Sequence, residues 1–260
     1  MMMAVRSVRD GLKNIWVSAM SLLAGLLLWQ YCLSGDDFSL MPPPSAIFSA
    51  LQDLIGSGEL WLHATASIKR LVPGWISGVC IGWFTGVLIG TSMTAFRLIT
   101  PWLVLLFPVP KIALFPAFIL FFGIGESARI SIIFMGVFFP VVYCVWQSVL
   151  SVPASFVDMG KSFGLSSFSI VWRIIIPGSL PGLFLSCRLT IAIALILLLA
   201  AEMLGANDGL GAFIVGAGSM AMMDKLFAGV TVLSLFSLFM FCMLGLLEKY
   251  YVHWRGSVCL

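Results

Sequence analysis

The sequence predicts an all-α polytopic membrane protein with six transmembrane helices. Its 260 residues are 61% hydrophobic and only 10% charged, and the mean hydropathy is +1.11. Soluble domains carry roughly 25% charged residues, so this chain has too few to cover a water-exposed surface. Apolar runs of about 20 residues, the length that crosses a bilayer, recur along the chain. They lack the period-two alternation of outer-membrane barrels, which leaves helices as the spanning elements.

The first expected span is the apolar run Ile15–Leu33, which follows Arg6, Arg9 and Lys13. A basic start before an apolar run also describes a signal peptide. This run is longer than a usual signal core, and no small-x-small site closes it cleanly. We therefore expect a retained helix.

A polar connection, residues 34–63, separates the first span from the second. Its three consecutive prolines at 42–44 forbid helix there. Ser45 then suits the cap of a short amphipathic helix that ends near Ile55. We expect this helix to lie on the membrane surface.

The second expected span, Ala64–Thr91, carries a glycine at every fourth position. At helical spacing these residues form a stripe along one face, which lets a neighbouring helix approach closely. The stripe serves either packing alone or a flexible, moving helix. Its members are Gly74, Gly78, Gly82, Gly86 and Gly90.

The third expected span, Pro101–Phe122, is broken by prolines at 108, 110 and 116. Such breaks free backbone carbonyls, and membranes tolerate them where protein or a water-filled path satisfies those groups. Lys111 lies in the broken part. An intramembrane lysine is a candidate functional residue, although its side chain could also reach the membrane interface.

Three further spans complete the expected set: Arg129–Val149, Gly182–Leu204 and Leu226–Leu247. A glycine-rich connection joins the last two. We divide the chain into an N-terminal segment (1–63) with the first span and the interfacial helix, a transmembrane core (64–255) with a large loop at 150–181, and a tail (256–260).

The distribution of basic residues predicts cytoplasmic termini. Six spans put both ends on one side, and that side collects eight Lys and Arg residues against four on the other. The positive-inside rule assigns the richer side to the cytoplasm. The eight are Arg6, Arg9, Lys13, Arg97, Lys161, Arg173, Lys249 and Arg255, and the four are Lys69, Arg70, Arg129 and Lys225.

The sequence offers no catalytic or metal-binding constellation. Its six cysteines form no metal-spaced cluster, and most lie in apolar runs, as small buried residues do. The only histidines, His63 and His253, lie near span ends. No basic block with interleaved aromatics indicates nucleic-acid binding. We expect no cofactor and no enzymatic activity of the chain itself.

The stretch from Ser155 to Gly182 contains Gly-Lys-Ser at 160–162, like the end of a nucleotide-binding loop. Such a loop needs a glycine five residues before its second glycine, and Ser155 stands there. No clear strand precedes it, so we do not expect nucleotide binding. The local pattern instead predicts two short helices, with Gly164 as a left-handed C-terminal cap and Ser166 or Ser167 capping the second.

The second of these helices, "FSIVWRIII", should stop at Pro177. Pro153 suits the first helical position of the preceding one. Small residues at Gly160 and Gly164 leave room for another surface to approach. Lys161 and Arg173 offer charge to a partner.

This stretch resembles the EAA loop of ABC-importer permease subunits. The family pattern is Glu-Ala-Ala, three residues, Gly, nine residues and Ile-x-Leu-Pro. Here Asp158-Met159-Gly160 occupies the first triplet and Gly164 follows after three residues. Ile174, Ile176 and Pro177 fall at the later positions. The departure from the family is Asp-Met-Gly in place of Glu-Ala-Ala.

Other segments resemble permeases of the nitrate, sulfonate, taurine and bicarbonate subfamily, so the likeness covers roughly residues 42–255. These are "HATASIKRLVPGW", "PVPKIALFPAFILFFGIGE" and "AAEMLGANDGLGAFI". The resemblance implies a type I importer permease fold in a bacterial inner membrane. It also implies a homodimer on two cytoplasmic ATP-binding subunits, supplied by a periplasmic or lipid-anchored solute-binding protein.

By the same resemblance, ATPase coupling falls to residues of the loop, namely Asp158, Gly160, Lys161, Gly164, Ile174 and Pro177. Candidate path residues are Lys111, Arg188 and Glu202. Glu202 could be a paired structural residue or line a gate, and Arg188 could attract an anion or pack helices. The two lie fourteen residues apart, about 20 Å, and cannot pair within one straight helix.

The substrate expected from the subfamily is an organic or inorganic anion such as a sulfonate, taurine or nitrate. A neutral heterocycle, such as a thiamine-precursor pyrimidine, is an alternative substrate. An ion-coupled secondary transporter is the rival from another class, and it would need inverted repeats and mid-membrane coupling acids. No such repeat is visible.

Overall fold

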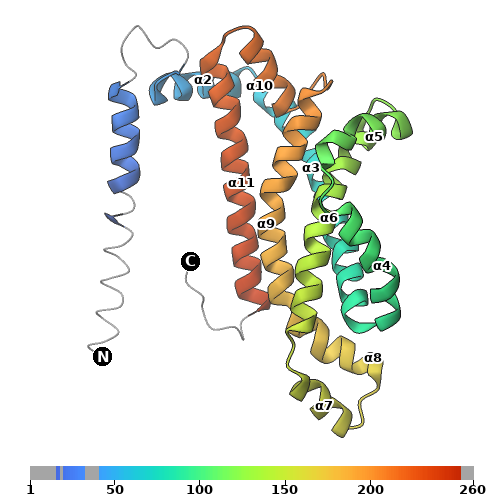
Figure 1. Ribbon diagram of the computed structural model, residues 1–260. Helices are drawn as coiled ribbons and strands as arrows, with labels where there is room; N and C mark the ends of the chain where they lie inside the picture. Colours follow the sequence, from blue (N-terminus) through green and yellow to red (C-terminus); the bar gives the residue numbers. More distant parts are fainter. Residues whose placement is uncertain (1–15, 18–19, 33–40, 253–260) are drawn as a thin grey trace, which may run out of the picture. The chain divides into compact units, whose positions relative to one another are not determined.

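The computed structural model describes residues 16–17, 20–32 and 41–252, and this part of the chain is helical without strands (Figure 1). Four helices are long and apolar enough to cross a membrane: α3 (Glu59–Thr91), α6 (Glu126–Leu150), the continuous helix Ser167–Met203, and α11 (Met223–Tyr251). Two shorter helical segments joined by a bend, Met93–Leu106 and Lys111–Phe122, raise the number to five if they count as one span. The first expected span, Ile15–Leu33, lies partly outside the described residues and contributes the shorter helix Met20–Cys32.

The chain forms two compact units, residues 1–61 with 213–231 and residues 62–212 with 232–260. In the first unit, α2 (Pro44–Gly56) buries Ile47, Ala50 and Leu54 on one face. The cap expected at Ser45 is wrong, because the helix already begins at Pro44, whose missing N–H is no loss at a first helical position. Ser45 instead exchanges two hydrogen bonds of 3.1 Å with the Gln30 amide.

In the second unit, the glycine stripe of α3 packs against a matching stripe of β-branched residues on α6. A Cβ added at any of the five glycines would lie 2.5–2.9 Å from an α6 atom. Each partner also lies four residues after the last: Ile133, Val137, Val141, Val145 and Val149. Residue numbers rise together on both helices, so α3 and α6 run parallel.

The core of the second unit lies between α6 and α9 (Ile176–Met203), which run antiparallel beside each other (Figure 1). Gly136 of α6 faces Leu197 of α9, and Ser148 faces Gly182. The buried α6 valines and isoleucines meet Ala194, Leu198 and Ala201 there. Their burial is what sequence hydrophobicity predicts for helices packed on several sides.

The broken span begins earlier than expected. The linker before Pro101 is helical, because Ser92 caps α4 (Met93–Leu106) by accepting the Ala95 N–H at 3.3 Å. The chain then bends by 90° at the expected prolines and continues through η1 (Lys111–Leu114) and α5 (Phe115–Phe122). Since α3 and α6 run parallel, the bent pair returns the chain from the end of α3 to the start of α6.

The glycine-rich connection after α9 is also more ordered than expected, because it contains α10 (Leu210–Ser219). Between α6 and α9 lie α7 (Ala154–Ser162) and α8 (Ser167–Ile170), beyond the ends of the long helices (Figure 1). The expected stop of the second loop helix at Pro177 is wrong. A π-helical turn, η2 (Val171–Ile175), precedes the proline, and the helix continues to Met203.

Candidate functional site

The α7–α8 loop, residues 151–175, is a stiff turn rather than a loose connection. The Leu165 N–H donates to the Gly160 carbonyl at 3.0 Å, and the Gly164 N–H donates to the Lys161 carbonyl at 2.9 Å. This is the Schellman arrangement, with Gly164 at φ +74° as the left-handed residue. Ser166 then accepts the Ser169 N–H at 3.3 Å and caps α8. Both expected caps are confirmed.

Gly160 allows the two helical parts of this loop to pack closely. A Cβ on Gly160 would lie 2.8 Å from Ile174 Cδ1, so the surface that approaches this glycine is the chain's own second helix. Pro153 is the N-cap of α7 rather than its first helical residue. Pro177 follows η2, where the Ile176 N–H donates to Val171 over a wider turn. A regular helix disfavours proline, which lacks an N–H and clashes with the preceding turn. The wider π-turn accommodates it.

The outer surface of the α7–α8 loop is apolar and exposed. A groove of about 540 Å³ lies between α7 and the start of α9, with Phe156, Met159, Arg173 and Pro177 among its lining. Phe163, Phe168 and Trp172 are also exposed. Asp158 and Lys161, the chain neighbours of the groove residues 159 and 160, form an exposed ion pair of 3.3 Å. Large exposed apolar patches with a polar rim mark interaction sites.

The Gly-Lys-Ser triplet at 160–162 ends a helix instead of starting one. Phosphate is held by free N–H groups at a helix N-terminus, where the helix dipole is positive. The C-terminal end of α7 offers the opposite polarity. The triplet therefore lies in a different local structure from that of a nucleotide-binding loop.

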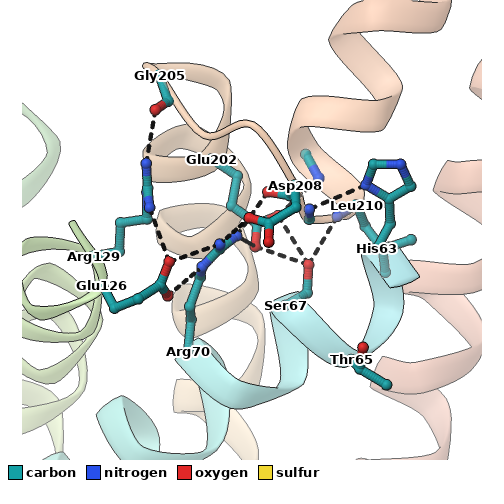
Figure 2. Close-up of polar contacts among 12 residues, drawn as sticks. His63, Thr65, Ser67, Arg70, Glu126, Arg129, Glu202, Gly205, Asp208 and Leu210 are labelled. Atoms are coloured by element: carbon teal, nitrogen blue, oxygen red, sulfur yellow. Dashed lines mark hydrogen bonds and ion pairs between the residues drawn. The ribbon is translucent and has the colours of Figure 1, made fainter. Parts of the chain in front are cut away.

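At the other end of the second unit, a buried arginine joins four segments (Figure 2). Arg70 of α3 is 1% exposed, and it donates to both oxygens of Glu126 at 2.6 and 2.9 Å. It also donates to Glu202 of α9 at 2.8 Å, and to the carbonyl and carboxylate of Asp208. Arg129 adds an ion pair with Glu126 at 3.1 Å. We call these five residues the Arg70 cluster.

The chain between α9 and α10, residues 204–209, is fixed by this cluster and its neighbours. Arg129 donates to the Gly205 carbonyl at 2.7 Å, and the Gly209 N–H donates to His63 Nδ1 at 3.1 Å (Figure 2). Ser67 accepts the Leu210 N–H at 2.8 Å. The Arg70 guanidinium holds the pKa of the half-exposed Asp208 carboxyl below its ordinary value. Within the described residues, no group of three His, Cys, Asp or Glu side chains is placed to hold a metal ion.

The three candidate path residues all have partners. Glu202 accepts from Arg70, from Ser67 at 2.8 Å and from the Gly211 N–H at 2.8 Å. The Arg188 guanidinium pairs with Glu248 of α11 at 2.7 Å and lies over the Phe241 ring.

Lys111 is satisfied by backbone. Its ammonium donates to the carbonyls of Leu106, Phe107 and Val109 at 2.7–2.8 Å, and so caps the broken end of α4. It also lies 4.7 Å from the centroid of the Phe139 ring, on the wall of a cavity of about 530 Å³ between the bend, α6 and α9. A role of any of the three in a path stays a prediction.

No sequence motif predicts that Arg70, Glu126 and Asp208 lie beside Glu202. Arg70 and Arg129 were expected only as charges on one side of the membrane. The available signal was that basic and acidic residues occur near the same ends of several apolar runs. Buried charges in such places need partners. The sequence alone does not say which ends meet.

Residues 78–252 match the model of a protein family, the binding-protein-dependent transport system inner membrane component. This chain belongs to that family. The match covers the C-terminal part of α3 and the whole of α6, the α7–α8 loop, α9 and α11.

Curated relatives of the permease extend the likeness over nearly the whole chain. It is 31% identical over 257 residues to the aliphatic sulfonates transport permease protein SsuC of Bacillus subtilis strain 168, covering 98% of this chain and 93% of that one. It is 30% identical over 223 residues to the taurine transport system permease protein TauC of Escherichia coli K12, covering 84% and 81%.

A solved structure of the MetNI methionine ABC transporter in an inward-facing conformation is similar to the permease. The TM-score is 0.61 at 19% identity, and the match covers 72% of this chain and 93% of that chain. This likeness shows a shared fold. The expected all-helical permease fold is therefore confirmed, whereas six spans are not.

Proposed function

We propose that this permease is the membrane subunit of an ATP-driven importer of a small organic anion, a sulfonate or taurine, and that it works as a homodimer. Two cytoplasmic ATP-binding subunits would drive it, and an extracytoplasmic binding protein would deliver the solute. The permease itself would not bind or hydrolyse ATP. The names of the two curated relatives support the substrate class. The observation that carries the mechanism is the capped, exposed α7–α8 loop.

This loop has the properties that force transmission requires. Two helical caps and the Gly160–Ile174 contact make it rigid, and α9 continues from it into the spanning helix without a break. Its exposed groove suits an apolar surface of the ATPase, while Asp158 and Lys161 present charge beside it. A displacement of the loop would therefore move α9 directly. Gly164 closes the turn between the two helices in its left-handed conformation, and Pro177 lines the groove.

We propose that the α7–α8 loop and both termini face the bacterial cytoplasm. The contact of Arg188, near the loop end of α9, with Glu248 brings the C-terminal end of α11 to the loop's side, which supports a shared side for the loop and the C-terminus. The charge count supports it as well. Arg70 and Arg129, two of the four basic residues on the other side, are neutralised by ion pairs. Lys161 and Arg173 remain exposed on the loop side.

For the translocation path, we retain Lys111 as the strongest of the three candidates because it borders a cavity. An anion entering that cavity would meet an ammonium group whose present partners are neutral carbonyls. Arg188 and Glu202 already hold charged partners, so their place in the path would need those ion pairs to open.

The proposal is tested by replacing Gly164, whose φ of +74° and open surroundings make it a surface position with a special backbone. Gly164→Asp should insert into the membrane normally but lose co-purification with its ATPase. Gly58→Asp is the matched control, because Gly58 has φ +79° and equally open surroundings but lies before α3.

Retained co-purification of Gly164→Asp would overturn the coupling role. Uptake by vesicles that contain the permease without ATPase would favour a secondary transporter. Uptake assays with taurine, nitrate and a thiamine-precursor pyrimidine would decide the substrate class.

A further inference from the structure

We infer that Arg70 is a positioning residue that fastens the chain between α9 and α10 to the block of α3, α6 and α9. This segment, residues 204–209, would then move together with the α7–α8 loop at the opposite end of the block. The inference rests on the proposed function, because it concerns how a motion driven by ATP is carried across the membrane.

The first support is that every N–H group of the Arg70 guanidinium donates a hydrogen bond. Its five N–H groups match five contacts: two to Glu126, one to Glu202 and two to Asp208. A planar fork that serves three carboxylates at once cannot be replaced by a lysine, which has three donors around one point. Arg70 thus joins α3, α6, α9 and the segment 204–209 at a single buried position.

The second support is that polar contacts, rather than buried apolar side chains, hold residues 204–209. Leu204 and Asn207 are exposed, and glycines at 205 and 209 take φ values of +119° and +108°. Arg129 donates to the Gly205 carbonyl, Arg70 donates to Asp208, and the Gly209 N–H donates to His63. A flexible glycine-containing segment would lose its shape if these contacts were removed.

The third support is that the block is continuous from one end to the other. The α3 glycines meet α6 from Gly74 to Gly90, and α9 packs along α6 with the core between them. Glu126 is the first residue of α6, and the α7–α8 loop follows its last residue, Leu150. At 1.5 Å per residue the two ends are about 37 Å apart. Close-packed helices transmit displacement over such a distance.

The experiment uses the complete importer in proteoliposomes with its ATPase and binding protein. The variants are Asp208→Asn, at a half-exposed position, and Arg70→Lys, which keeps the charge but not the fork. Lys69→Met is the matched control, because Lys69 is the exposed neighbour of Arg70. The readouts are basal ATPase rate, stimulation by solute-loaded binding protein, and hydrogen exchange of the amides at 205–211.

We expect Asp208→Asn and Arg70→Lys to assemble and keep the basal ATPase rate. Stimulation of the ATPase by solute-loaded binding protein should fall about tenfold, which is the factor that one lost charge-assisted hydrogen bond corresponds to. Hydrogen exchange of the amides at 205–211 should become faster. Lys69→Met should match the wild type. This pattern would support a positioning role, because a merely structural defect lowers assembly and basal rate together.

Full stimulation of both variants would overturn the inference and leave the proposed function intact. Loss of assembly and basal rate in both variants would also overturn it, since Arg70 would then serve folding alone. Absence of stimulation in the wild type would instead contradict the proposed function.

Discussion

Gly78→Ala tests whether the contact between α3 and α6 is as close as the structure has it. The added Cβ would lie 2.8 Å from Val137 Cβ, 2.9 Å from Val137 Cγ1 and 3.1 Å from the Phe134 carbonyl. Carbon atoms in contact sit at about 3.5–4.0 Å, so the helices would have to separate locally by roughly 1 Å. The obstacles are a branched Cβ and a backbone oxygen, which no rotamer change can move.

The expected cost of Gly78→Ala is that of overpacking, about 1–3 kcal/mol. The melting temperature should therefore fall, by about 2–4 °C per kcal/mol for a chain of this size. Thermal unfolding of the detergent-solubilised permease measures it. Gly136→Ala should cost less, because the atom in its way is the terminal Cδ1 of Leu197, which can rotate aside.

Gly216→Ala is the matched control. Gly216 lies within α10 and has nothing within 4 Å of its added Cβ. Alanine there should stabilise the helix by about 0.5–1 kcal/mol. If Gly78→Ala raised the melting temperature as Gly216→Ala does, the close approach of α3 and α6 would be refuted.

Three further predictions follow from the loop and the ion pairs. Gly164→Ala should cost about 1–2 kcal/mol, because an L-residue is strained at φ +74°; proteolysis within residues 151–175 should speed up, and an unchanged rate would contradict the strain. Because the Asp208 pKa is lowered, its ion pair stabilises fully above the unfolded pKa of about 4 and is lost as pH falls through the lower folded value. The melting difference between wild type and Asp208→Asn should therefore be constant from about pH 8 to pH 5 and vanish in stronger acid; a decline already near pH 6 would contradict it. Arg188→Gln and Glu248→Gln should each lower the free energy of unfolding, and the double variant should lose less than the sum of the two losses. The difference should be roughly 0.5–3 kcal/mol, and additive losses would contradict the ion pair.

Much of the fold could be predicted because its signals are local. Long apolar runs gave α3, α6, α9 and α11 with small errors at their ends. The caps at Gly164 and Ser166 follow from residue types whose backbone or side-chain preferences are strong. The errors lie where context overrides propensity.

The continuation of the helix through Pro177 needs a π-turn, which no short motif announces. Helix in the linker before Pro101 needed only Ser92 as a cap, a signal that was present but weak.

The candidate site could be predicted only in part for a different reason. The α7–α8 loop is contiguous in sequence, so its spacing is visible. The Arg70 cluster joins residues up to 138 positions apart, and charge alone does not reveal such a contact. Lys111 shows a further limit. Its position indicated a functional residue or one that reaches the membrane interface, but did not show that its ammonium donates three hydrogen bonds to the carbonyls freed by the bend beside it.

The regular spacing of the α3–α6 contact restricts how these helices can slide. Each glycine of α3 receives a branched side chain of α6, and the next match lies four residues on, about 6 Å along the axis. A shift of 2 or 3 Å along the axis would press the valine side chains of α6 onto the α3 residues that lie between the glycines. The two helices therefore have no favourable register between one match and the next. Any sliding of helices past each other in this protein must occur at other helix surfaces.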